Sequence, residues 1–470
     1  MSNNLFHFGM IGLGTMGRNL LLNLADNGFS VIGFDKDEQK GSALLNESAP
    51  QHKVKTVSSL SEMVLQLEQP RKIMMLVPAG RPVDDVIDSL LPLLQPGDII
   101  IDGGNSFFVD TLRRTTFLQS KQLHFVGMGV SGGEKGARFG PSIMPGGDVA
   151  AWKSLQPLLE AVSAKVNGEP CVAYMGKDAA GHYVKMVHNG IEYAIMQLIS
   201  EVYDVLRTGL GLNNEEMHQV FTQWNEGELK SFLIEISAQI FLQKDPDTGK
   251  NLVDIILDKA GSKGTGKWTS QEAMNLPISI PTIDIAVAFR DISVYKDERV
   301  AAEALYQPKR IPIAANKATF IAHLGNALQA AIIICYAQGL AMLHKASSVY
   351  NMNIPLKNVV KIWRGGCIIR SLLLEDFYTA YQNNPDLANI LLDPQLAKQL
   401  QIKELALRTV IVQAIQSKIA VTGLMSALGY LDAYTDANMP VNLIQAQRDL
   451  FGAHTYQRID KPGIFHTQWD

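Results

Sequence analysis

Short apolar runs alternate with amphipathic helical patterns over roughly the first 175 residues. A continuous apolar run of four to eight residues is typical of a strand buried on both faces. The runs are FHFGMIG (6–12), FSVIGF (29–34), KIMMLV (72–77), GDIIID (97–102) and LHFVGMG (123–129). Strands that alternate with helices predict an α/β Rossmann-type doubly wound sheet, mostly parallel and covered by helices on both faces.

From about Ala179 the pattern changes to long segments with a 3.6-residue period, which predicts an all-helical region. A chain of 470 residues is too long for one ordinary core. We therefore expect an α/β domain at 1–178, a large all-α domain at 179–438 and a C-terminal tail at 439–470. The tail is polar, and Pro462 and Gly463 break any helix near its end, so we expect it to be extended and to lie on another subunit.

One predicted helix, KMVHNGIEYA (185–194), carries polar side chains where an amphipathic helix normally places its apolar face. The polar residues stand at offsets 0, 3, 4, 7 and 8, and they are Lys185, His188, Asn189, Glu192 and Tyr193. Such a stripe is either a solvated outer face or a set of working groups held on one rigid rod.

A weak internal repeat favours working groups over a solvated face. The segment from Tyr193, YAIMQLISEVYDVLRTGLGLN, resembles YAQGLAMLHKASSVYNMN from Tyr336. When the two tyrosines are aligned, the four polar residues before Tyr193 pair with Leu328, Ala331, Ile332 and Cys335. The second copy is apolar at these positions, so a duplicated helix does not by itself require polarity there.

Composition and charge exclude several classes of protein. The net charge is −4 and no long basic block occurs, which argues against a nucleic-acid or anionic-membrane surface. The first residues do not resemble a secretory signal, and apolar segments such as 330–343 are expected to be too short and too interrupted to span a bilayer. The cysteines Cys171, Cys335 and Cys367 are scattered, which fits buried thiols in a reducing cytoplasm and neither a disulfide framework nor a zinc site.

MIGLGTMG supplies Gly12-x-Gly14-x-x-Gly17 directly after a predicted strand and before a predicted helix. The first glycine allows a tight turn, the second lets the backbone approach a pyrophosphate, and the third lets helix and strand pack closely. The free N–H groups at the start of the following helix then face the anion. This context predicts a dinucleotide-binding domain.

The second predicted strand ends in Asp35-Lys36-Asp37, 18 residues after the last glycine of the turn. A carboxylate at Asp35 stands where it can accept hydrogen bonds from a ribose 2′-hydroxyl, the mark of NAD. Asp35 and Asp37 would repel a 2′-phosphate, and Lys36 would partly offset that repulsion. The charges therefore favour NAD moderately over NADP.

Two further segments have the composition of ligand-binding turns. Ser131-Gly132-Gly133 follows a predicted strand, and its glycines leave backbone N–H groups free to hold a carboxylate, with the serine hydroxyl beside them. Asn105, in DGGNS, follows the fourth predicted strand, at the carboxyl edge where such sheets bind ligands. We expect Asn105 to contact both nicotinamide and substrate.

The chain resembles the 6-phosphogluconate dehydrogenase family from end to end. The motifs that carry the resemblance are GLGTMGRNL, IIDGGNS, GVSGGEKGARFGPSIMPGG, GHYVKMVHNGIEY, GSKGTGKWT, WRGGCIIRS and LIQAQRDLFGAHTY, in the family's order and spacing. The resemblance implies a Rossmann domain, an all-helical domain that contains a duplication, and a tail that crosses to the partner of a homodimer.

The chain departs from the family pattern at two places. The family's usual NADP form ends its second strand in Asn-Arg-Thr, where this chain has Asp35-Lys36-Asp37. Many members also carry a lysine in the motif that here reads LVPAG, where Pro78 stands. Both differences bear on the choice between NAD and NADP and leave the sugar-phosphate chemistry unchanged.

The activity that the resemblance implies is oxidative decarboxylation of 6-phospho-D-gluconate to D-ribulose 5-phosphate and CO2 with reduction of NAD(P)+. It implies Lys185 as the base of oxidation and the acid of decarboxylation, and Glu192 as the acid that protonates the enediol. A lowered pKa is expected for Lys185 and a raised pKa for Glu192. No metal is expected, because decarboxylation of a β-keto acid does not require one and the sequence contains no metal-ligand spacing.

The remaining site residues divide into two groups. Those expected to bind substrate are Asn105, Ser131, Gly132, Gly133, His188, Asn189, Tyr193, Lys263, Thr265, Arg290, and, from the neighbouring subunit, Arg448 and His454. Those expected to bind the cofactor are Gly12, Leu13, Gly14, Thr15, Met16, Gly17, Asp35, Lys36, Asp37, Val77, Ala79 and Asn105.

Two other functions are compatible with parts of the pattern. Another β-hydroxyacid dehydrogenase, acting on a small acid, would share the glycine turn, the SGG turn and the lysine, but would not need the predicted phosphate contacts Lys263, Thr265 and Arg290. A dinucleotide-binding sensor without catalysis would need neither the base nor the acid.

Overall fold

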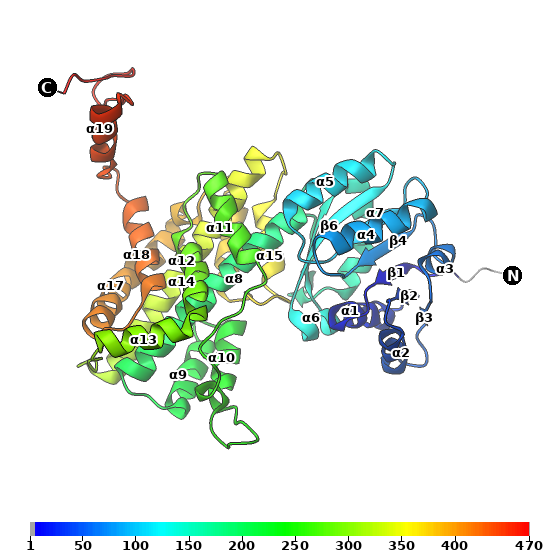
Figure 1. The fold of residues 1–470 in the computed structure, drawn as a ribbon, viewed down its shortest axis with the longest axis horizontal. Helices are drawn as coiled ribbons and strands as arrows, with labels where there is room; N and C mark the ends of the chain where they lie inside the picture. Colours follow the sequence, from blue (N-terminus) through cyan, green and yellow to red (C-terminus); the bar gives the residue numbers. More distant parts are fainter. Residues whose placement is uncertain (1–4, 470) are drawn as a thin grey trace.

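The computed structural model describes residues 5–469 as a Rossmann-type domain followed by a large helical domain and a projecting tail (Figure 1). The main sheet has seven strands in the order β3-β2-β1-β4-β5-β6-β7. The strands are β1 (Phe8–Ile11), β2 (Val31–Phe34), β3 (Val54–Thr56), β4 (Lys72–Met75), β5 (Ile99–Asp102), β6 (His124–Ser131) and β7 (Ser142–Gly147). The strand order reverses direction beside β1, which creates the crevice at the carboxyl edge where doubly wound sheets bind ligands.

Helices cover both faces of this sheet, because successive side chains of each buried strand point to opposite faces. In β5, Ile99 and Ile101 join one apolar cluster with α1 and α7, whereas Ile100 joins the other with α3, α4 and α5. The helices of this domain are α1 (Thr15–Asp26), α2 (Glu38–Glu47), α3 (Leu60–Leu65), α4 (Arg81–Leu90), α5 (Phe108–Gln119), α6 (Gly133–Phe139) and α7 (Val149–Val162).

The predicted Rossmann-type sheet is confirmed, and five of its strands lie where the apolar runs predicted them. The strands β3 and β7 were not predicted. β3 has only three residues, all partly exposed. β7 contains Pro145 and two glycines, which argue against a strand in general but are tolerated on an edge, where β7 pairs antiparallel with β6.

The second domain is helical, as predicted, and is built around α8 and α14, which pack against each other. Its helices are α8 (Ala180–Asp204), α9 (Asn214–Glu226), α10 (Phe232–Leu242), α11 (Thr265–Asn275), α12 (Pro281–Val294), α13 (Lys296–Tyr306), α14 (Lys317–Val349), α15 (Leu356–Trp363), α16 (Leu373–Asn383), α17 (Pro394–Gln416) and α18 (Thr422–Tyr434). α8 also packs against β6 and β7, so this helix contacts both domains.

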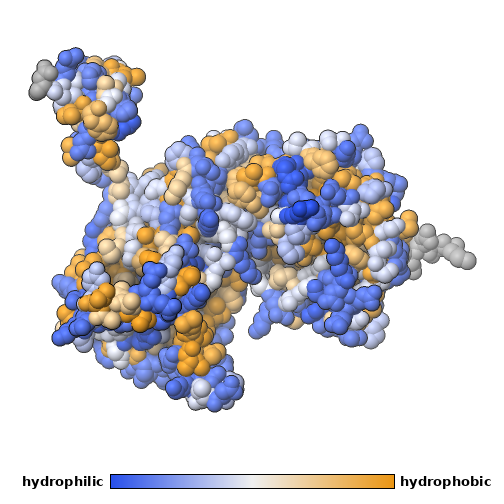
Figure 2. Space-filling model, in the orientation of Figure 1, coloured by the Kyte–Doolittle hydropathy of each residue, from blue (hydrophilic) through white to orange (hydrophobic). Residues whose placement is uncertain are grey.

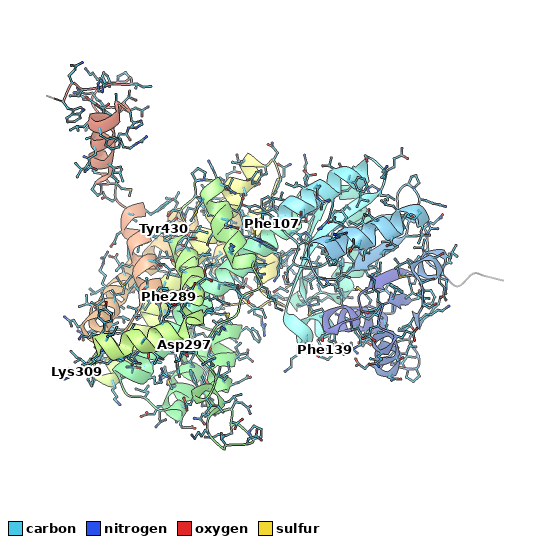
Figure 3. The ribbon with its side chains drawn as sticks, viewed as in Figure 1. Phe107, Phe139, Phe289, Asp297, Lys309 and Tyr430 are labelled. Carbon is cyan, nitrogen blue, oxygen red and sulfur yellow. The ribbon has the colours of Figure 1, made fainter. Side chains whose placement is uncertain are left out.

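Close contacts join the helical domain to the Rossmann-type domain. A Cβ at Gly181 would lie 2.2 Å from the carbonyl oxygen of Gly127 in β6, so only glycine fits at the start of the helix. The ring of Phe107, before α5, packs on that of Trp268 in α11 with centroids 5.0 Å apart, and it lies where the two domains meet (Figure 3).

The helix α14 corrects one expectation. It has 33 residues and is long and apolar enough, by length and composition, to cross a membrane, whereas its apolar segment was expected to be too short. However, 67% of its most apolar window is buried inside the molecule, against α8 and α17 among other helices. A helix that is apolar all round is also what the centre of a large helical domain requires.

The tail projects from the body beyond α18, but it is not extended throughout (Figure 1). Residues Val441–Gly452 form a further helix, α19, and the chain then folds back along it. The buried carboxylate of Asp449 holds this fold together, because it accepts hydrogen bonds at 2.8–3.0 Å from the N–H groups of Thr455, His466, Thr467 and Trp469.

Candidate active site

The glycine turn between β1 and α1 has the geometry of a pyrophosphate cradle. Gly12 has a φ of +93°, and a Cβ there would lie 2.4 Å from the carbonyl oxygen of Leu76. A Cβ at Gly17 would lie 1.9 Å from the carbonyl oxygen of Gly12, so α1 packs directly on the turn. At Gly14, the N-cap of α1, a Cβ would meet no described atom within 4 Å, and no described side chain caps the helix there. The first N–H groups of α1 therefore face open space, as an anion site requires.

Asp35, at the end of β2, is turned toward this cradle. Its carboxylate accepts the N–H of Leu13 at 2.7 Å and the N–H of Asp37 at 3.0 Å, and Lys40 lies 3.5 Å away. The side chain of Leu13 is buried in the core, so only its backbone can face a cofactor. Lys36 and Asp37 are exposed beside them, and Asp37 also caps α2 by accepting the N–H of Gln39.

A cleft of about 660 Å³ opens between the carboxyl edge of the sheet and the helical domain. It brings together residues that are far apart in the sequence: Met16, Asn105, Val130, Ser131, Gly132, Gly133, Lys185, Asn189, Glu192, Tyr193, Met196, Gly261, Ser262, Lys263, Thr265, Arg290 and Ile368. Eleven of the predicted substrate-binding and catalytic residues are in this lining. Of the predicted cofactor residues, Met16 and Asn105 are in it, Thr15 is exposed at the start of α1, and Ala79 is exposed in the turn after β4.

The polar stripe of α8 faces this cleft. Lys185 is only 6% exposed, and its Cβ packs so closely on β6 that a Cβ at Gly129 would lie 2.4 Å from it. Asn189, Glu192 and Tyr193 follow along the same face of the helix. The aligned positions of α14 are buried and apolar, which agrees with the duplication inferred from the sequence.

His188, unlike the other four residues of the stripe, is not in the lining of the cleft and belongs to a hydrogen-bonded chain beneath it. Ser131 Oγ lies 3.3 Å from His188 Nε2, and His188 Nδ1 lies 3.1 Å from Asn189 Oδ1. Asn189 Nδ2 then donates to Thr265 Oγ1 at 3.2 Å. His188 is fully buried, and burial together with the charge of Lys185 lowers its pKa well below the usual value. The neutral imidazole therefore donates from Nδ1, because Asn189 Oδ1 can only accept.

The two ionisable groups expected to act as base and acid have pKa values shifted in opposite directions. Burial lowers the pKa of Lys185, although the charge of Glu192 and the thiol of Cys367 oppose this. Burial raises the pKa of Glu192, although Lys185 and Arg290 oppose this. Both directions favour the neutral forms, an amine that can take a proton and a carboxylic acid that can give one.

Cations and N–H donors gather at the far end of the cleft. The guanidinium of Arg290 stacks on the Tyr193 ring, 3.6 Å from its centroid, and donates to the carbonyl oxygen of Gly261 at 2.9 Å. The Tyr193 hydroxyl accepts the N–H of Lys263 at 3.3 Å. A Cβ at Gly266, in the first turn of α11, would lie 2.6 Å from the Tyr193 ring, so the start of α11 sits tightly on α8. This end of the cleft suits a phosphate.

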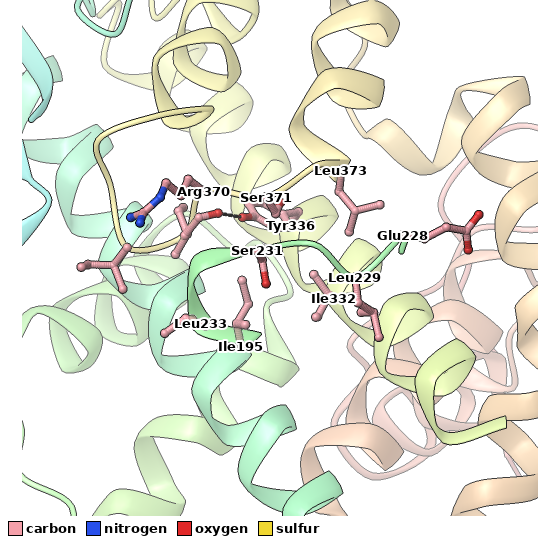
Figure 4. A pocket seen from close by; sticks show the side chains of 12 residues that line it. Ile195, Glu228, Leu229, Ser231, Leu233, Ile332, Tyr336, Arg370, Ser371 and Leu373 are labelled. Carbon is pink, nitrogen blue, oxygen red and sulfur yellow. Dashed lines mark hydrogen bonds between the residues drawn. The ribbon is translucent and has the colours of Figure 1, made fainter. Parts of the chain in front are cut away.

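The SGG turn lies at the other end, against the segment that joins α15 to α16. Gly132 has a φ of +120°, and a Cβ there would lie 2.5 Å from the carbonyl oxygen of Gly366. Gly133 is exposed beside it. Ile368, two residues beyond Gly366, lines the cleft and also a smaller apolar pocket behind it, where the Tyr336 hydroxyl donates to the carbonyl oxygen of Ile369 at 2.6 Å (Figure 4).

Asn105 is exposed in the turn after β5, and the preceding aspartate shapes that turn. Asp102 is fully buried, and its carboxylate accepts the N–H of Gly104 at 3.0 Å and the hydroxyl of Ser106 at 2.6 Å. A Cβ at Gly104 would lie 3.3 Å from the carbonyl oxygen of Val77, so the turns after β4 and β5 lie against each other.

Arg448 and His454 do not reach this cleft within the chain. Both lie on the projecting tail, where Arg448 donates to Gln445 at 3.0 Å and the His454 ring packs on Phe451. Ala453 and Thr455, which flank His454, have φ values of +51° and +61°. Side chains with a Cβ rarely adopt this left-handed conformation, and such conformations cluster at functional sites.

Sequence reasoning missed several apolar residues of the cleft, namely Val130, Met196 and Ile368. Ile368 lies inside the motif WRGGCIIRS, so the motif marked its segment. Apolar side chains carry no chemical signature of their own, and only the fold shows that these three face a ligand site rather than the core.

Comparisons with known proteins agree with this geometry. Residues 7–176 match a family model described as the NAD binding domain of 6-phosphogluconate dehydrogenase, and residues 181–469 match one described as the C-terminal domain of the same enzyme. The NADP(+)-dependent decarboxylating 6-phosphogluconate dehydrogenase of Bacillus subtilis (strain 168) is 51% identical over 98% of both chains. The decarboxylating enzyme of Escherichia coli (strain K12) is 49% identical over 98% of both chains.

A solved structure shows the same fold. Plasmodium falciparum 6-phosphogluconate dehydrogenase, described in its apo form and in complex with its cofactor NADP+ and its substrate 6-phosphogluconate, matches with a TM-score of 0.96. It is 41% identical, and the match covers 98% of this chain and 100% of that one. The chain described here belongs to the 6-phosphogluconate dehydrogenase family.

Proposed function

We propose that this protein catalyses the NAD(P)+-dependent oxidative decarboxylation of 6-phospho-D-gluconate to D-ribulose 5-phosphate and CO2. The observation that carries the proposal is that a buried lysine and a partly buried glutamate of one helix line a single cleft, together with the SGG turn and the cationic residues Lys263 and Arg290. An acid of six carbons with a terminal phosphate matches this order of groups.

Lys185 acts first as the base. Its lowered pKa makes the neutral amine accessible, and the amine takes the proton of the C3 hydroxyl. A dinucleotide held by the glycine turn would supply the acceptor for the hydride that leaves C3. The ammonium that has formed on Lys185 then donates to the C3 carbonyl oxygen, and it stabilises the negative charge that develops there as the C1 carboxylate leaves as CO2.

Glu192 acts second, as the acid. Its raised pKa keeps the carboxylic acid accessible, and it gives its proton to the carbon that lost CO2. As carbon takes this proton, the enediol oxygen returns its own proton to Lys185 and the ketone of ribulose 5-phosphate forms. One proton then passes from the Lys185 ammonium to the Glu192 carboxylate, which restores both groups, so the overall reaction neither consumes nor releases a proton. His188 and Asn189, fixed by their hydrogen bonds, orient the C3 hydroxyl.

The two ends of the cleft hold the two ends of the substrate. The Ser131 hydroxyl and the SGG turn bind the carboxylate, and Tyr193, Lys263, Thr265 and Arg290 bind the phosphate. Because the cations are concentrated at the phosphate end, an unphosphorylated hydroxy acid loses most of its charge-assisted hydrogen bonds.

The glycine turn fits a dinucleotide, since its closest approaches leave no room for side chains while Gly14 faces open space. For the choice between the two cofactors, we propose a preference for NAD. Asp37 and Asp35 place two carboxylates beside the position of a 2′-phosphate, against the ammonium groups of Lys36 and Lys40. The NADP dependence of the Bacillus subtilis relative is the opposing observation.

We further propose a homodimer in which the tail of each subunit completes the partner's cleft through Arg448 and His454. The tail exposes a set of large apolar side chains, which a soluble monomer rarely does (Figure 2). They are Val441, Leu443, Ile444, Leu450, Phe451 and Ile464. A cytoplasmic location is also proposed, supported by three cysteines that are all free and buried.

A turnover assay tests the proposed reaction. CO2 release and NAD(P)H formation, one for one, are expected with 6-phosphogluconate and not with hydroxyisobutyrate, serine or gluconate. Turnover of the small acids alone would identify another β-hydroxyacid dehydrogenase. Cofactor binding without turnover of any of these would identify a non-catalytic dinucleotide sensor.

A further inference from the structure

His182 is a buried ionisable residue that the proposed mechanism does not use. It lies on α8 three residues before Lys185, so the two side chains share one face of the helix. Only 1% of His182 is exposed. Its ring nitrogens contact the other domain: Nε2 lies 3.0 Å from the carbonyl oxygen of Asp102 in β5, and Nδ1 lies 2.7 Å from Thr111 Oγ1 in α5.

These two contacts define one tautomer of the ring. The carbonyl of Asp102 can only accept, so Nε2 carries the proton and donates it. Nδ1 then has a lone pair and accepts from the Thr111 hydroxyl. Burial lowers the pKa of His182, although the Asp102 carboxylate opposes this, and the Arg114 guanidinium adds to the lowering. The imidazole is therefore neutral, with each nitrogen paired once.

Gly127 in β6 has no side chain, and this leaves space for the contact between His182 and Thr111. A Cβ at Gly127 in β6 would lie 2.7 Å from Thr111 Cγ2 and 2.8 Å from His182 Nδ1. Glycine at this position of the strand, like Gly181 at the start of α8, is thus required by the close approach of the two domains.

Asp102 is also the residue that shapes the turn of Asn105. While its carbonyl oxygen accepts from His182, its carboxylate holds Gly104 and Ser106. The ring therefore ties the helix that carries Lys185 to the last residue of the strand whose turn carries Asn105, and both of these residues line the cleft.

We infer that His182 is a positioning residue that fixes Lys185 relative to the Asn105 turn, and so fixes the base and the C3 hydroxyl relative to the nicotinamide. The inference rests on the proposed function, since it assumes that Lys185 is the base. His182 touches neither substrate nor cofactor. Its effect is on geometry, and a displacement of about 1 Å at a reacting centre can cost on the order of 100-fold in rate.

Two matched variants of α5 test this role. Thr111→Val removes the hydroxyl that pairs with His182 Nδ1 and keeps the shape of the side chain. Thr115→Val, one turn later, makes the same change at a buried threonine whose hydroxyl bonds only to the carbonyl oxygen of Thr111, at 2.8 Å, among the described residues. Both variants lose one buried hydroxyl from one helix, and only the first loses the contact with His182.

Thr111→Val is expected to lower kcat about tenfold or more, with dissociation constants for NAD(P)+ and 6-phosphogluconate within about twofold of the wild type. The primary isotope effect on hydride transfer from 3-deuterated substrate should rise. Thr115→Val should retain kcat within about twofold, even if its melting temperature falls as far as that of Thr111→Val. Equal loss of kcat in both variants, or none in Thr111→Val, would overturn the inference.

A measurement on the wild-type protein keeps the inference testable if Thr111→Val does not fold. In protein labelled with 15N-histidine, His182 should show a protonated Nε2 and an unprotonated Nδ1 that do not titrate across neutral pH. A protonated Nδ1 would refute the assigned hydrogen bonds, and a titrating ring would refute the neutral, fixed imidazole. Both results are independent of turnover, so they remain distinguishable from a failure of the proposed reaction.

Discussion

Lys185 and Glu192 stand seven residues apart on α8, and both side chains line one cleft. Seven residues are two helical turns, or about 10 Å along the axis. This separation places an amine and a carboxyl group along one side of the same cleft. Because one helix carries both, their spacing does not depend on how the two domains move.

Replacing Lys185 by Met should lower kcat by about 10²–10⁴-fold, the usual contribution of a general acid–base group. The methionine keeps the length of the side chain, so calorimetry should still detect binding of 6-phosphogluconate. Lys177→Met, at an exposed lysine just before α8, is the control and should leave kcat unchanged. A near-normal rate in Lys185→Met would show that another group is the base.

Replacing Glu192 by Gln should change the pH profile as well as the rate. In the wild type, kcat/KM should rise with pH as Lys185 loses its proton and fall at higher pH, because the proton of Glu192 is then missing. Glu192→Gln should lose the alkaline decline. Its rising limb should persist, because that limb reports the amine of Lys185, whose pKa is lowered by burial. A decline that persists in Glu192→Gln would assign the acid to another residue.

The stack of Arg290 on Tyr193 predicts graded losses of substrate affinity. Arg290→Gln should raise KM for 6-phosphogluconate about 10- to 100-fold, because a charge-assisted hydrogen bond to phosphate contributes roughly 1.5–3 kcal/mol. Tyr193→Phe keeps the ring under Arg290 and loses only the hydroxyl, so KM should rise by about fivefold. Steady-state kinetics measure both, and a larger effect from Tyr193→Phe would contradict the assignment.

The cofactor preference should respond to Asp37. Asp37→Thr combined with Lys36→Arg removes one carboxylate beside the 2′ position, and threonine can still cap α2. The ratio of kcat/KM for NADP over NAD should rise about tenfold, since one unit charge at close range is worth about 1 kcal/mol or more. The variant leaves the hydrogen bonds of Asp35 intact. An unchanged ratio would mean that the residues at the end of β2 do not discriminate between the 2′-hydroxyl of NAD and the 2′-phosphate of NADP.

The proposed crossing of the tail predicts complementation between two inactive variants. Lys185→Met and His454→Ala, each inactive or nearly so alone, should regain about a quarter of the wild-type activity when subunits are mixed at random, because half of the dimers are mixed and each mixed dimer has one complete site. Mixing two preparations of the same variant is the control. No gain in mixed dimers would place His454 in the cleft of its own chain.

The polar stripe of α8 was readable from the sequence because its residues keep the helical period and the aligned positions of α14 are apolar. The strands β1, β2, β4, β5 and β6 were readable because both of their faces are buried. Long apolar runs and strict periods are the patterns that local sequence preserves best.

The remaining features depend on contacts that local patterns do not contain. Pro145 argues against a strand in the sequence, so β7 was not predicted. The strand forms because it can pair with β6 at the edge of the sheet. The helix α19 lies in a segment expected to be extended, and Asp449 joins it to residues up to 20 positions away. The spacing of the sequence predicted that Asp35 lies at the ribose. Its carboxylate also accepts the N–H of Leu13, and no spacing rule predicts this hydrogen bond.

The fold of the tail around Asp449 has a consequence for assembly. A disordered tail would have to become ordered on reaching a partner, at a cost of about 1–2 kcal/mol for each residue fixed. Here the turn that carries His454 is already shaped within one chain by the Asp449 carboxylate. In the proposed homodimer, two subunits would therefore meet with their contact surfaces already folded, and the rate of encounter rather than the rate of refolding would limit the formation of complete sites.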